Sequence, residues 1–92
     1  MKALDRLRRA IHQQNYRFSS HANDEMSDDR LEAEDIEEAI LNGVIPKKYT
    51  RDPRGTRYEV VGNISSGRPI AVLCRFLPDG TLLIITSYEI EK

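Results

Sequence analysis

Apolar residues recur with two different spacings along the chain. In the first half they lie three or four positions apart, as at Leu4, Leu7 and Ile11, which is the spacing of an amphipathic helix. After Val44 they form short continuous or alternating stretches, rich in β-branched residues and separated by Gly, Pro, Asn and Asp, as is typical of strands and turns. The pattern predicts helices followed by strands.

A histidine marks the start of a second, shorter helix. Residues 16–19 alternate aromatic and polar side chains and are expected to be a short extended segment. Ser19 or Ser20 can then cap a helix whose first turn contains His21. The other histidine, His12, lies among polar residues at the end of the first helix, and we assign it no role.

The last helix precedes four predicted strands. Apolar positions between residues 31 and 44 define this helix, and Gly43 is expected to end it in a left-handed conformation. Short loops between the strands favour an antiparallel meander. We therefore expect residues 1–92 to form a single α+β domain, with two or three N-terminal helices packed on a four-stranded antiparallel meander sheet. The predicted strands are residues 45–50, 56–61, 69–77 and 82–89.

Charge is distributed unevenly. The net charge of −1 argues against a strongly basic nucleic-acid binder, but residues 24–38 carry −8 and residues 39–92 carry +3. The acidic segment is most simply a solvated helix face. The lone Cys74 cannot form an internal disulfide, and no apolar stretch is long enough for a membrane span. We expect a cytoplasmic protein without a membrane partner.

One strand register gathers polar side chains on the sheet. If residues 78–81 and 63–68 are the loops, Tyr58, Arg75, Thr86 and Tyr88 share one face. A slip of one residue would separate them. Two interpretations stay open at this point: a binding surface, or ordinary strand residues with Arg75 paired to a helix carboxylate.

The chemistry of these residue types suits RNA. Arginine matches phosphate, tyrosine stacks on bases or donates a hydrogen bond, and histidine moves a proton near neutral pH. RNA carries its own nucleophile, the 2′-hydroxyl, so orientation and acid–base groups suffice for cleavage without metal. The chain has neither an HExxH motif nor a CxxC pair, and no glycine-rich nucleotide loop. No metal or cofactor is expected.

Several short motifs extend over nearly the whole chain from Tyr16 onward. They are Phe18-Ser-Ser-His21-Ala22 with Met26, Asp35-Ile36-Glu-Glu-Ala39-Ile40 with Gly43, Arg57-Tyr58, Gly67-Arg68-Pro-Ile70, and Ile85-Thr86-Ser-Tyr88. In this order and spacing they resemble a bacterial family of domains of unknown function. That family is placed within the broad superfamily of RelE, barnase, EndoU and colicin RNase folds. The resemblance implies a RelE-like fold and the toxin of a toxin–antitoxin pair, a metal-independent endoribonuclease.

The strand register and the resemblance together suggest roles for individual residues. We expect His21, as general acid or base, Arg75 and Tyr88 to be catalytic, and the RNA- or phosphate-binding residues to be Tyr58, Arg68 and Thr86. The expected partners are RNA, with ribosome association left open, and a cognate antitoxin protein.

Two positions depart from the family pattern. Relatives carry arginine just before the methionine, where this chain has Glu25, and an Arg-Gly pair where it has Asp29-Arg30. Acids thus replace two potential phosphate contacts. The alternative is a non-catalytic protein-binding domain of the same fold.

Overall fold

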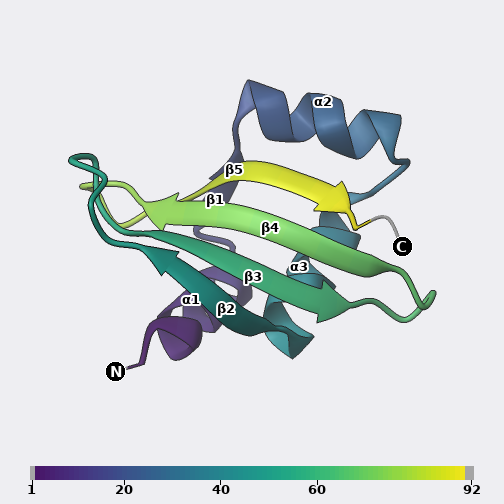
Figure 1. Cartoon of the computed structure of the whole chain (residues 1–92), viewed down its shortest axis with the longest axis horizontal. Coiled ribbons are helices and arrows are strands. Elements are labelled where there is room, and N and C mark those ends of the chain that lie inside the picture. The colour runs from purple at the N-terminus through teal and green to yellow at the C-terminus, as the bar shows by residue number, and fades with distance from the viewer. Residues whose placement is uncertain (1, 91–92) are drawn as a thin grey trace.

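The computed structural model describes residues 2–90, in which three helices and one five-stranded sheet follow the order α1-β1-α2-α3-β2-β3-β4-β5 (Figure 1). The strand order in the sheet is β1-β5-β4-β3-β2. The elements are α1 Ala3–His12, β1 Tyr16–Phe18, α2 Ser20–Asp28, α3 Ala33–Asn42, β2 Val44–Tyr49, β3 Arg57–Asn63, β4 Pro69–Phe76 and β5 Leu82–Glu89.

The mixed α+β class is confirmed, but the expectation of a four-stranded antiparallel meander is wrong. The extended segment before α2 is a fifth strand, β1, which pairs in parallel with the last strand, so that Tyr16 lies beside Leu82 and Phe18 beside Ile84. The backbone N–H of Ser19 continues this pairing to the Ile84 carbonyl at 2.9 Å. Three residues are too few to display a strand period, and their partner is distant in sequence, so local pattern does not reveal the pairing.

The capped helix start is confirmed. The Ser19 side chain accepts a hydrogen bond from the Ala22 backbone N–H at 3.0 Å, and its own hydroxyl donates to the Ile85 carbonyl at 2.7 Å. Ser19 thus satisfies a free donor at the helix start and also ties that start to β5. The Ser19 bonds to Ile84 and Ile85 hold the start of α2 beside β5, along which the helix lies (Figure 1).

The expected left-handed end of α3 is wrong. Gly43 has φ −93° and ψ −175°, which is extended backbone. What requires a glycine is space, because a Cβ at Gly43 would lie 2.4 Å from the Ala39 carbonyl oxygen. Gly62 on β3 has the same close neighbour, also at 2.4 Å. Two glycines therefore allow the end of α3 to approach the sheet more closely than any other residue would permit.

The sheet has one covered face and one open face. Helix α3 packs on β3 and β4 and α1 packs on α3, whereas no helix of residues 2–90 lies over the opposite face (Figure 1). Side chains of the central strands alternate accordingly, with Val60, Val72 and Ile84 buried among the helices. Cys74 is also buried there, and burial raises the pKa of its thiol to about 12, which leaves it without nucleophilic character near neutral pH.

Candidate functional site

Three of the four residues expected to share a sheet face do so. Arg75, Thr86 and Tyr88 lie on the open face, since Arg75 pairs with Leu83, Thr86 with Leu73, and Tyr88 with Ala71. The prediction for Tyr58 is wrong. It pairs with Cys74 on the covered face and is only 8% exposed, so it belongs to the core.

The register of β4 and β5 differs from the expected one in two ways that offset each other. The loop between them is one residue longer, so that Phe76 rather than Leu77 faces Leu82. This shift alone would have moved Thr86 to the face opposite Arg75. An irregularity in the pairing follows Leu73 and leaves Ile85 as an extra residue, which returns Thr86 to the open face.

The open-face residues form successive rows across β4 and β5. Thr86 lies opposite Leu73, two residues along β4 from Arg75, and Tyr88 lies two residues further, opposite Ala71. At about 3.3 Å per residue, the Arg75 and Tyr88 rows are about 13 Å apart, with Thr86 midway. Arg75 and Tyr88 would therefore contact different parts of an extended ligand, on either side of Thr86.

A cationic row crosses the whole sheet at the level of Arg75. Strand pairing joins one residue from each strand into this row, and four inter-strand steps of about 4.8 Å make it about 19 Å long. It carries three arginines and an aromatic ring, and only its β5 member is apolar. The row runs Arg17 (β1), Leu83 (β5), Arg75 (β4), Arg57 (β3) and Tyr49 (β2).

The central arginines of the row are not neutralised equally. The Arg57 guanidinium lies 3.2 Å from the Asp52 carboxylate and stacks over the Tyr49 ring at 5.0 Å. Arg75, directly opposite Arg57, takes part in none of the ion pairs found within residues 2–90. The interpretation in which a helix carboxylate pairs with Arg75 therefore finds no support, and the row keeps an excess of positive charge.

His21 is exposed on the side of α2 that adjoins the open face. Ala22 is buried, and Asn23 lines a hollow with Phe18, on the covered side of the sheet. Successive helical residues are rotated by about 100°. His21 and Asn23, which flank the buried Ala22, therefore project from opposite sides of α2, and His21 is on the side away from the hollow. Its side chain is 67% exposed, and its Nε2 lies 3.2 Å from the Glu25 carboxylate.

The Ser19 contacts also bear on the position of His21. Because Ser19 bonds to Ile84 and Ile85, the start of α2, which carries His21, is held beside this part of β5. Glu25, one helical turn further along α2, is the side chain that contacts the imidazole.

Arg68 has its donors occupied within the protein. It pairs with Glu89 at 2.7 Å through Nη2, which also donates to the Asp29 carbonyl, and its Nη1 donates to the Arg30 carbonyl at 3.4 Å. The guanidinium thus satisfies carbonyls at the end of α2 and joins that end to β5. Phosphate binding by Arg68 stays a prediction.

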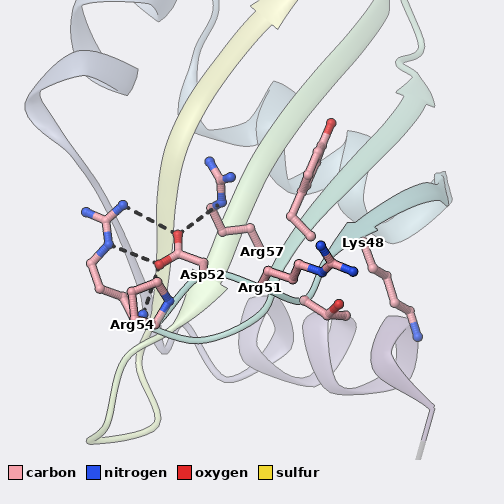
Figure 2. A pocket seen from close by; sticks show the side chains of 8 residues that line it. Lys48, Arg51, Asp52, Arg54 and Arg57 are labelled. Carbon is pink, nitrogen blue, oxygen red and sulfur yellow. Dashed lines mark hydrogen bonds and ion pairs between the residues drawn. The ribbon is translucent and has the colours of Figure 1, made fainter.

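A basic hollow at the β2–β3 connection was not anticipated. This hairpin pocket, of about 710 Å³, is lined by four cationic side chains and one carboxylate (Figure 2). The sequence holds a signal for it, since residues 47–57 contain five basic residues and one acid, but the strand and turn pattern of this stretch does not by itself indicate a hollow. Its charged members are Lys48, Arg51, Asp52, Arg54 and Arg57.

Neither a metal cluster nor a membrane helix occurs in the part of the chain that the structure describes. Among residues 2–90, no three His, Cys, Asp or Glu side chains are grouped closely enough to hold a metal ion. None of the helices in this range has the length and apolar character needed to cross a membrane.

Comparison with known proteins identifies the family. Curated proteins and solved structures give no match. A family model described as Domain of unknown function (DUF4258) matches residues 18–89, which include α2, the open-face residues of β3 to β5 and the hairpin pocket. Because the match extends over more than half of the chain, this protein belongs to the family Domain of unknown function (DUF4258).

Proposed function

We propose that the protein binds single-stranded RNA across the open face of its sheet and cleaves it without metal, as the RelE-like toxin of a toxin–antitoxin pair. The cationic row carries this proposal. Arg57 and Arg75 face each other on neighbouring strands, an arrangement that disfavours the folded state and that an RNA phosphate would relieve. Tyr49 at the end of the row and Tyr88 beyond Thr86 are 37% and 38% exposed and supply surfaces for base stacking.

The cleaved phosphate is placed beside Thr86 in this proposal. Arg75 lies on one side of Thr86 along the sheet and Tyr88 on the other. In this proposal His21 approaches the phosphate from the start of α2, which Ser19 ties to β5. The Thr86 hydroxyl would bind a phosphate oxygen. Arg75 would stabilise the negative charge that develops on the phosphorus substituents.

The chemical step is an internal displacement. The 2′-hydroxyl oxygen attacks the adjacent phosphorus, its proton passes to a base, and the bond from phosphorus to the 5′-oxygen breaks. The leaving oxygen takes a proton from an acid, so the products are a 2′,3′-cyclic phosphate and a 5′-hydroxyl. His21, oriented by Glu25 at 3.2 Å, would move one of these protons, and the Tyr88 hydroxyl would assist the other transfer.

The expected partner follows from the same surface. An antitoxin that restrains this activity would cover the open face with carboxylates that match the arginine row. We place the toxin in the cytoplasm, where its RNA substrate is made.

The test is a digest of total RNA with purified protein, in the presence and absence of a chelator. Wild-type protein should yield fragments with 2′,3′-cyclic phosphate ends in both arms, whereas His21→Ala should lose at least about 100-fold in rate. His12→Ala is the matched control, because the other histidine is exposed on α1 and should cleave normally. Intact RNA at high protein concentration, or equal rates for wild type and His21→Ala, would refute the proposal.

A second candidate function is protein binding without catalysis. The acidic segment favours it, since four of its carboxylates, Asp24, Asp28, Glu32 and Glu34, are exposed on or beside α2 and α3. A domain of this kind would leave RNA intact in both arms of the digest and would not arrest growth when its synthesis is induced. Growth arrest that depends on His21 would instead favour the toxin.

A further inference from the structure

We propose that the hairpin pocket is a second phosphate subsite, which holds the RNA strand at a phosphate away from the one that is cleaved. This inference rests on the proposed function and adds a second binding site, separate from the proposed catalytic residues His21, Arg75 and Tyr88. Four cations and one carboxylate line the pocket, which leaves a net charge of +3.

The carboxylate organises two of the cations. Asp52 accepts hydrogen bonds from the Arg54 backbone N–H at 2.9 Å and from the Arg54 Nε at 3.3 Å, and it pairs with the Arg57 Nε at 3.2 Å. Figure 2 shows Arg54 and Arg57 reaching Asp52 from different directions. Guanidinium groups fixed in this way lose less conformational entropy when an anion binds, so Asp52 acts as a positioning residue.

Of the two remaining cations, Arg51 is available to a ligand, whereas Lys48 pairs with Tyr58 and lies on the other face of β2. Neither Arg51 nor Lys48 belongs to any ion pair formed within the described range 2–90, and both side chains are exposed. Figure 2 shows Arg51 directed away from the Asp52 carboxylate. A phosphate in the hollow would therefore meet at least one cation whose charge is not already compensated.

Continuity with the open face favours RNA as the occupant. Arg57 belongs both to the cationic row and to the hairpin pocket, and Tyr49 lines the pocket beside it with its ring under the Arg57 guanidinium. A strand that follows the row from Arg75 toward β2 enters the pocket without leaving the positive surface. An exposed aromatic ring next to phosphate-binding arginines is suited to a nucleotide, whereas an acidic peptide has no base to stack on it.

The test measures binding separately from cleavage. Fluorescence anisotropy with a labelled 2′-O-methyl oligoribonucleotide, which lacks the nucleophilic hydroxyl, reports affinity for wild type, Arg51→Ala/Arg54→Ala and the control Arg9→Ala. Arg9 is likewise an exposed arginine, and it lies on α1, outside the hairpin pocket. The double variant should bind about tenfold more weakly at low salt, and its slope of log affinity against log salt should fall by about 0.7 for each phosphate that the variant no longer neutralises. It should still cleave a dinucleotide, which is too short to reach the pocket, at the wild-type rate.

The outcomes separate this inference from the proposed function. Wild-type affinity and salt slope in the double variant, or equally strong binding of poly-glutamate to the pocket, would overturn the subsite. Binding that depends on Arg51 and Arg54 without any RNA cleavage would support the subsite and refute the nuclease. Failure of the wild-type protein to bind the oligonucleotide would overturn both.

Discussion

Arg57 and Arg75 occupy directly opposite positions on adjacent antiparallel strands, on the face of the sheet that no helix of residues 2–90 covers. Like charges in such a cross-strand pair oppose folding. Asp52 compensates Arg57, but Arg75 has no equivalent partner within this range. The sheet therefore sacrifices some stability to hold positive charge at its centre, as functional surfaces commonly do.

Replacing Arg75 should make the protein more stable and less active. Arg75→Thr removes the repulsion and keeps a residue that favours strands, so the free energy of unfolding should rise by about 0.2–1 kcal/mol. RNA binding and cleavage should fall at the same time. Urea unfolding and the RNA digest measure the two effects, with Arg9→Ala as control. A loss of stability in Arg75→Thr would show that Arg75 has a structural role.

Replacing Arg68 should chiefly affect stability. Arg68→Ala removes the pair with Glu89 and leaves the Asp29 and Arg30 carbonyls at the end of α2 without their donor. We expect the free energy of unfolding to fall by about 1–2 kcal/mol, measured by urea unfolding. Arg68→Lys should recover only part of this stability, because an ammonium cannot reproduce the planar fork. Undiminished stability with weaker RNA binding would instead identify Arg68 as a phosphate ligand.

The Asp52 carboxylate should give a pH-dependent contribution to stability. The backbone N–H of Arg54 and then its guanidinium hold the pKa of Asp52 below its usual value. A lowered folded-state pKa stabilises the protein above the unfolded pKa of about 3.9, and the contribution disappears as pH falls through the folded value. Wild type should exceed Asp52→Asn in stability near pH 7 but not at about pH 2. A difference that persists in acid would contradict this.

Tyr16 should contribute to stability with the opposite pH dependence. Its hydroxyl donates to the Glu37 carboxylate, and burial, followed by that hydrogen bond, raises the pKa of Tyr16. The contribution is fully present below the unfolded pKa of about 10 and declines as pH rises toward the folded value. Tyr16→Phe should cost about 1–2 kcal/mol at neutral pH, and its deficit relative to wild type in thermal unfolding should shrink above pH 10.

The contact between α3 and the sheet should tolerate no Cβ. Gly62→Ala would place a Cβ 2.4 Å from the Ala39 carbonyl oxygen, so we expect it to lower the free energy of unfolding by about 1–3 kcal/mol. Gly67→Asn is a suitable control. Gly67 has φ +87° and no atom within 4 Å of an added Cβ, and asparagine tolerates positive φ. Similar unfolding midpoints for both variants would contradict the steric explanation.

Local patterns predicted the elements better than their arrangement. The amphipathic spacing around Leu7 and Ile11, the serine cap at Ser19 and the last strand, Leu82–Glu89, all follow from interactions within a few residues, and the structure confirms them. Pairing of β1 with β5 depends instead on contacts between opposite ends of the described chain. No local signal specifies such a contact.

The candidate site was predictable only in part, for a similar reason. Strand alternation places a side chain on one face or the other, but a single extra residue reverses the assignment. For Tyr58 this made the prediction wrong, whereas the irregularity at Ile85 restored Thr86 to the face of Arg75. The full arginine row required the register of all five strands, which the sequence does not specify.

The Ser19 contacts with β5 also set an order of events during folding. Ser19 hydrogen-bonds to a strand residue 66 positions later in the chain, so α2 cannot reach its final position until β5 has been synthesised and paired. Contacts of such large sequence separation form late and slowly. On the ribosome, His21 would therefore stay apart from Arg75 and Thr86 until translation has passed the last strand. For the proposed ribonuclease, this order means that a partly made chain would lack the assembled site, so the message from which it is being translated would be protected.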